Sequence, residues 1–204
     1  RLTSVEWPDN VTIFGETVER RPVMRDERVV ALVHGISHAR QQESRNLAKN
    51  FSRDTAHDDA FQIGVLHCAV EGQRNHDRYA PCALSDLLDS RLDAWALGHI
   101  HERDILQRTP FIAYSGNTQG LHINEQGPRG CLSVTATNDG SGWICREKFV
   151  PLSSVQWQQR LLELNDVAHI DEVEQRLLTT LDDASRETGP ECEALIVRVR
   201  CTGR

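Results

Sequence analysis

Three short apolar runs, separated by segments of helical character, constrain the fold of this chain more than any other feature of its sequence. They cover residues 28–33, 61–66 and 93–97, and the first two are rich in the residues that favour strands. Residues 39–51 and 81–88, which lie between the runs, carry apolar side chains at helical spacing. The resulting order of strand, helix, strand, helix and strand predicts an α/β fold.

Histidines stand directly after the second and third runs. His67 ends the second run, and His99 and His101 follow the third run after Gly98. Neutral imidazole is the commonest protein ligand for transition metals, and open α/β sheets bind ligands at their strand ends. We therefore expect His67, His99 and His101 to ligate metal where the strand ends converge. We also expect Gly98 to let the backbone turn close to this site.

The second half of the chain has a different pattern. Short strands separated by Gly- and Asn-rich turns are expected at residues 105–107, 111–114, 131–137 and 143–150, as in a β-meander. From residue 151, a strand (155–164), a helix (172–185, capped by Asp171) and a strand (194–200) suggest a small α+β domain. We thus expect two domains, 1–150 and 151–204. Two more strands are expected near the start, at residues 3–7 and 11–14.

Composition narrows the class of protein. The 204 residues are 39% hydrophobic and 26% charged, as in ordinary globular proteins. There is no apolar run of 18 residues and no leader-like segment, so we expect a cytoplasmic protein that does not associate with membranes. The six cysteines form no Cys-x-x-Cys pair, which favours reduced thiols. The net charge of −7 argues against nucleic acid covering the whole surface, but it is compatible with one cationic groove.

Several motifs resemble those of one enzyme family. Residues 97–101 (Leu-Gly-His-Ile-His) resemble the closing Gly-His-x-His motif of the calcineurin-like metallophosphoesterases, and His67 resembles the isolated ligand histidine before it. The stretch Gln119–Gly130, with its Gln-Gly and Glu-x-Gly-Pro-x-Gly elements, is similar to the SbcD/YhaO-type DNA repair nucleases. Further segments resemble that branch in the same order: 66–72, 76–82, 95–101, 115–130 and 195–203. The resemblance covers residues 11–203.

The resemblance implies a fold and an activity. The fold would be part of the metallophosphoesterase β-sandwich with flanking helices, followed by part of a capping domain. Two divalent ions, usually manganese, would clamp a DNA phosphodiester and activate water. His67 and His99 would bind one ion and His101 the other. The partners would be DNA and an SMC-like ATPase of the SbcC type, and the full-length protein would form a homodimer.

The sequence departs from the family in one large respect. The motifs Asp-x-His, Gly-Asp-x-x-Asp and Gly-Asn-His-Asp, which supply carboxylates and the histidine that protonates the leaving group, do not occur. Residues 75–77 (Asn-His-Asp) imitate the last of them, but they follow His67 and fit the branch's His-Asp-x-Tyr-Ala-Pro loop. The chain therefore resembles the C-terminal portion of a nuclease whose catalytic residues lie upstream. Because manganese prefers oxygen ligands, we expect this portion alone to bind it weakly and to hydrolyse little.

Other residues and functions remain open. His34, after the first run, could be a fourth ligand, but a structural role is favoured. His122 could line a substrate groove or stand in a turn. Arg198 and Arg200 share one face of a strand, where they could contact DNA phosphates or only solvent. The alternatives to a nuclease are another phosphatase or phosphodiesterase, which the capping-like segment after residue 150 disfavours, and a non-catalytic binding module.

Overall fold

The computed structural model describes residues 6–40, 42–71 and 79–203, which form two compact units. The first unit contains the described residues up to 100, together with 105–114 and 136–145. The second contains 101–104, 115–135 and the described residues from 146 onward. The domain division predicted after residue 150 stays a prediction.

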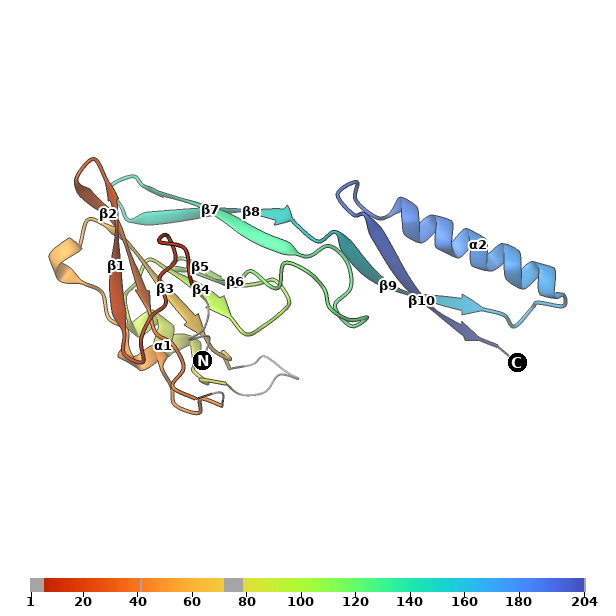
Figure 1. Cartoon of the computed structure of the whole chain (residues 1–204), viewed down its shortest axis with the longest axis horizontal. Helices are drawn as coiled ribbons and strands as arrows, with labels where there is room; N and C mark the ends of the chain where they lie inside the picture. Colours follow the sequence, from red (N-terminus) through yellow and green to blue (C-terminus); the bar gives the residue numbers. More distant parts are fainter. Residues whose placement is uncertain (1–5, 41, 72–78, 204) are drawn as a thin grey trace. The chain divides into compact units, whose positions relative to one another are not determined.

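A six-stranded sheet dominates the first unit (Figure 1). Its order is β1-β2-β3-β4-β6-β5, in which β2, β3, β4 and β6 run parallel and β1 pairs antiparallel with β2. The strands are β1 (Glu19–Arg25), β2 (Arg28–Gly35), β3 (Phe61–His67), β4 (Ala94–Gly98), β5 (Asp104–Arg108) and β6 (Phe111–Tyr114). The three apolar runs thus became adjacent parallel strands, β2, β3 and β4, and the predicted α/β class is confirmed.

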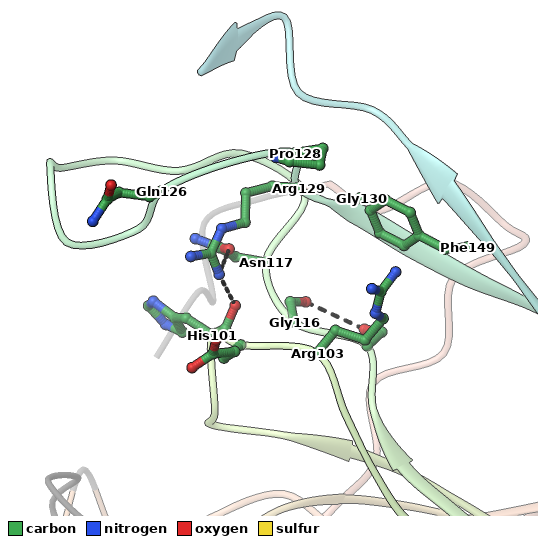
Figure 2. A pocket seen from close by; sticks show the side chains of 11 residues that line it. His101, Arg103, Gly116, Asn117, Gln126, Pro128, Arg129, Gly130 and Phe149 are labelled. Carbon is green, nitrogen blue, oxygen red and sulfur yellow. Dashed lines mark hydrogen bonds between the residues drawn. The ribbon is translucent and has the colours of Figure 1, made fainter. Parts of the chain in front are cut away.

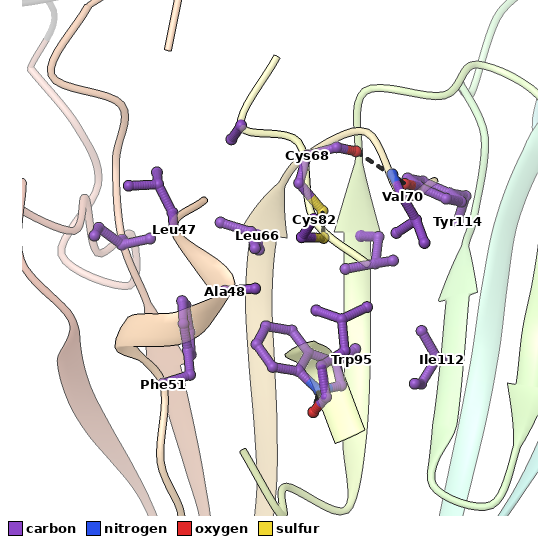
Figure 3. Close-up of a cluster of buried hydrophobic side chains, with 14 of the residues drawn as sticks. Leu47, Ala48, Phe51, Leu66, Cys68, Val70, Cys82, Trp95, Ile112 and Tyr114 are labelled. Carbon is purple, nitrogen blue, oxygen red and sulfur yellow. Dashed lines mark hydrogen bonds between the residues drawn. The ribbon is translucent and has the colours of Figure 1, made fainter. Parts of the chain in front are cut away.

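The core of this unit lies on one face of the sheet (Figure 3). Trp95 of β4 is 1% exposed and packs against Phe51, with 4.7 Å between the ring centroids. Its indole N–H donates to the carbonyl of Leu87 in helix α1 (Leu84–Asp89), at 3.2 Å. Buried Tyr114 donates its hydroxyl to the carbonyl of Cys68 at 2.9 Å. These contacts tie the helix and the loop after β3 to the sheet, which fixes the end of β3 where His67 lies.

Three sequence predictions about secondary structure are wrong, and the first is the helix at residues 39–51. Residues 39–51 form no α-helix in their described part; only a 3-10 turn, η1 (Ala48–Asn50), is present. The Glu43 carboxylate binds the backbone N–H and guanidinium of Arg45, and the Asn46 amide donates to Asp86. Such side-chain bonds compete with helical ones.

The strand predicted at residues 11–14 is also absent, because no neighbouring strand pairs with that segment. Its end is instead held by Ser37, whose hydroxyl donates to the carbonyl of Phe14. The strand predicted at residues 3–7 falls partly outside the described residues. The expected β-meander is also split, because β6 joins β4 in the large sheet.

The second unit contains a β-α-β segment, as the sequence predicted. Strands β9 (Val155–Glu163) and β10 (Ala194–Thr202) pair in parallel, and helix α2 (Ile170–Arg186) packs against both (Figure 1). The helix begins two residues earlier than predicted, so that His169 occupies the N-cap position in place of Asp171. Strands β7 (Gly130–Asn138) and β8 (Trp143–Pro151) form a hairpin that contributes residues to both units.

Two expectations from composition can also be compared with the structure. All six cysteines are free thiols, with Cys68 and Cys82 buried. Over the described ranges, no helix combines the length and the apolarity needed to cross a bilayer.

Candidate metal centre

His67 and His99 lie side by side at the carboxyl ends of β3 and β4 in the first unit. Their ring centroids are 5.2 Å apart, with an angle of 65° between the ring planes. Residue 98 pairs with His67 across the two strands, and a Cβ added at Gly98 would lie only 3.1 Å from Nδ1 of His67. The glycine before His99 therefore leaves room for the imidazole of His67, which a larger residue would displace.

The backbone at His99 has an unusual conformation. Its φ is +104°, a value that residues with a Cβ rarely adopt. The sequence suggested that Gly98 would provide the turn, but His99 itself takes the positive φ. Such a conformation costs about 1–3 kcal/mol and occurs preferentially at functional sites. The ring of the residue in this conformation is the one that meets the ring of His67 edge to face.

Two further aromatic side chains surround this histidine pair. Nε2 of His38 lies 2.7 Å from the carbonyl oxygen of His67, and the two imidazole rings meet edge to face. Tyr79 packs its ring against His99 with 5.3 Å between centroids. Sequence reasoning gave neither residue a role, although Tyr79 belongs to the predicted His-Asp-x-Tyr-Ala-Pro loop. Residues 75–77 of that loop lie outside the described residues.

His101 lies in the second unit and contacts a buried carboxylate. Its Nδ1 is 2.6 Å from Oε1 of Glu125. The other carboxylate oxygen, Oε2, accepts hydrogen bonds from the backbone N–H of Leu121 at 2.7 Å and from the amide of Asn117 at 3.0 Å. An oxygen that only accepts makes Nδ1 the donor nitrogen of the His101 ring. The other nitrogen, Nε2, is then the one with a lone pair for a ligand.

Glu125 remains ionised because its hydrogen bonds outweigh the effect of burial. Burial by itself would raise the pKa of this carboxyl, but the bonds from Leu121, His101 and Asn117 hold the pKa at about 2. His122 adds a weaker contact, with Nε2 at 3.5 Å from Oε1. Sequence reasoning missed Glu125 itself. The only sequence signal was its position three residues after His122 in a motif already assigned to the family.

The predicted substrate-binding residues lie on the surface of the second unit. His122 is largely exposed. Arg198 and Arg200 are exposed on β10, where they alternate with the half-buried Val197 and Val199. The two arginines share one face of the strand, as the sequence predicted.

His34 has a structural environment. It is fully buried on β2, and its Nε2 lies 3.1 Å from the side-chain oxygen of Gln62. Burial, reinforced by the charge of Arg20, lowers the pKa of His34 below its ordinary 6.5. A neutral, hydrogen-bonded core histidine is the role that the sequence favoured.

The histidines fit part of a divalent metal site and not a whole one. Among the residues that the structure describes, no group of three or more His, Cys, Asp or Glu is arranged to hold an ion. His67 and His99 would provide two nitrogen ligands, whereas a tetrahedral or octahedral ion needs four to six. The carboxylate of Glu125 contacts the predicted ligand His101 through Nδ1, so it orients that ring and does not add a ligand to the His67–His99 pair.

Comparison with known proteins adds one relative. No protein-family model matches the chain. It is 32% identical over 198 residues to a protein of Bacillus subtilis strain 168 described as the uncharacterized metallophosphoesterase YhaO. This likeness supports the metallophosphoesterase family. It covers 96% of this chain but only 47% of the relative, so the chain spans about half the length of the metallophosphoesterase that it matches.

Proposed function

We propose that this chain is part of a metal-dependent phosphodiesterase that cleaves DNA, a nuclease of the double-strand-break repair type. The observation that carries the proposal is the His67–His99 pair at adjacent parallel strand ends, in a chain similar to a metallophosphoesterase. Paired imidazoles at the ends of two adjacent strands, with strained backbone at His99, are suited to ligation. Divalent ions, manganese in our proposal, would supply Lewis-acid catalysis when bound.

This chain's own residues then have distinct tasks. His67 and His99 would hold one ion, with Gly98 giving the rings their space. His101 would offer Nε2 to the second ion while Glu125 holds Nδ1. The remaining ligands and the histidine that protonates the leaving group are expected from residues outside this chain, so we propose that the chain alone has little activity.

The choice of DNA as substrate rests on the second unit. Exposed Arg198 and Arg200 on one face of β10 could bind backbone phosphates, and His122 could contribute near Glu125. The family resemblance adds an SMC-like ATPase as partner, a homodimer as the assembled form and the cytoplasm as the location, all as parts of the same proposal.

A nuclease assay tests this proposal. Full-length protein carrying His99→Ala should lose manganese-dependent cleavage of linear DNA by at least about 100-fold, because a ligand to the ion is removed. His57→Ala serves as the matched control, because it removes an exposed histidine of the 3-10 turn η2 (Thr55–His57) that is not a proposed ligand. Equal activity of His99→Ala and wild type would refute the metal assignment. Cleavage of a small phosphate ester by the wild type, without cleavage of DNA, would favour another phosphatase.

A further inference from the structure

A polar cavity of about 140 Å³ opens beside His101, entirely within the second unit (Figure 2). Two arginines, Arg103 and Arg129, face it together with His101 and the amide of Asn117, and Phe149 of β8 closes one side. The exposed Glu102 also lines it. The cavity is large enough for a tetrahedral oxyanion with a few waters, since a water takes about 30 Å³.

Arg129 is held in place by hydrogen bonds, but one of its N–H groups has no acceptor among the residues that the structure describes. Its Nη1 donates to the carbonyl of His101 at 2.6 Å and lies 3.3 Å from the side-chain oxygen of Asn117. Its Nε is buried and has no hydrogen-bond partner within the described part of the chain. A buried guanidinium N–H without an acceptor is costly, so the contacts among the described residues do not use all the donors of Arg129.

Arg103 is oriented by an aromatic ring. The central carbon of its guanidinium lies 4.1 Å from the ring centroid of Phe149. Stacking uses the flat face of the guanidinium, so its N–H donors still point outward in the plane, where they can bind an oxyanion in fork geometry. The ring thus holds the second cation without consuming its hydrogen-bonding capacity.

The floor of the cavity depends on close backbone contact. Gly116 has φ of +79°, and a Cβ there would lie 2.9 Å from the carbonyl oxygen of His101 and 3.0 Å from the amide nitrogen of Arg103. Only glycine allows this approach. It places the stretch that carries His101 and Arg103 against the loop that carries Asn117, so backbone contact brings the lining residues of the two segments together.

We propose that this cavity binds a phosphate group of a nucleic acid strand beside His101, which is itself a proposed metal ligand. The assignment to substrate rests on the proposed function, whereas the binding of phosphate does not. Among the side chains that line the cavity, two guanidiniums outnumber the single carboxylate of Glu102, so the lining itself carries a net positive charge. The ionised Glu125 is not part of the lining and is hydrogen-bonded to His101. Arg129 would connect the bound phosphate to the backbone of His101, so a phosphate in the cavity would position the strand relative to His101.

The test uses protein without metal, in the presence of a chelator. Titration with inorganic phosphate at pH 7, followed by NMR of the arginine Nε–H signals, should show saturable shifts at two arginines. Arg103→Gln should weaken binding about ten-fold or more by removing a charge-assisted fork. Arg25→Gln, the same substitution at an exposed arginine of β1, should have no effect. A short oligothymidylate should compete with the phosphate.

Arg129 gives a second, independent variant. Arg129→Lys keeps the charge but loses the planar fork and Nε, and it should weaken binding to an extent similar to Arg103→Gln. Phosphate binding that is absent, or that is unchanged in both variants, would overturn the site. Binding of phosphate that the oligonucleotide cannot displace would overturn its assignment to a nucleic acid strand. If phosphate binds as expected but the full-length protein does not cleave DNA, the proposed function fails and the phosphate site stands.

Discussion

Replacing Glu125 by glutamine should change both the stability of the second unit and the proton position on His101. The carboxylate accepts from three donors, namely Nδ1 of His101, the amide of Asn117 and the backbone of Leu121. Glutamine has one oxygen and one NH₂ group. Its oxygen can retain the Asn117 and Leu121 bonds only if the NH₂ faces His101. Nδ1 must then accept, and Nε2 becomes protonated.

The cost in stability can be worked out in two ways. Bonds to a charged acceptor contribute about 1.5–3 kcal/mol each, against about 0.5–1.5 for neutral ones, so three bonds lose about 3 kcal/mol in total. The pKa of the Glu125 carboxyl is about 2 against an ordinary 4.5, and at about 1.4 kcal/mol for each pKa unit the difference is again about 3 kcal/mol. For a chain of this size, the loss lowers Tm by about 6–12 °C.

Two measurements check this prediction. Calorimetry of wild type and Glu125→Gln at pH 7 gives the change in Tm. Long-range ¹H–¹⁵N NMR of the imidazoles reports which ring nitrogen of His101 carries the proton. The depressed pKa means that the stabilising effect is complete above pH 4.5 and disappears as pH falls toward 2, so the Tm values of the two proteins should converge in acid. An unchanged Tm together with an unchanged His101 tautomer would refute the reasoning.

Three other predictions follow from the first unit. Gly64→Ala should lower stability by about 1–3 kcal/mol, because the new Cβ would lie 2.5 Å from the ring of buried Trp95; unaltered urea unfolding would contradict this. His34→Gln should flatten the pH dependence of stability, because burial lowers the pKa of His34 and the neutral ring loses its stabilising effect as pH falls below 6.5. Urea unfolding midpoints of the variant and the wild type between pH 7 and 5 measure this effect, and parallel curves for the two proteins would count against it. Zn²⁺ should bind the chain more tightly than Mn²⁺ in calorimetric titration, because two imidazoles favour Zn²⁺, and His67→Ala should abolish the Zn²⁺ signal. Tighter binding of Mn²⁺ than of Zn²⁺ would contradict this prediction.

The main strands could be predicted because their signal is local. The runs that became β2, β3 and β4 each supply buried residues to the sheet, among them Leu32, Leu66 and Trp95, and the histidine positions follow directly from where those runs stop. The pairing of His67 with His99 was predictable for the same reason, since parallel neighbours end at one edge.

The features that escaped prediction depend on contacts between distant residues. Residues 39–51 have helical periodicity, but Asn46 bonds to Asp86, 40 residues away, and this contact outweighs propensity. Glu125 lies 24 residues from His101 and acts on it only because the Gly116 loop brings the two segments together. No pattern in the sequence marks one glutamate among many as buried.

The positive φ of His99 has an evolutionary consequence. A side chain held in this conformation costs folding free energy, which glycine at the same position would recover in part. Drift toward stability alone would therefore replace His99, and retention of histidine at a position that penalises it requires selection for what the imidazole does. A laboratory selection for thermal tolerance, with no demand for activity, should be expected to remove this residue early.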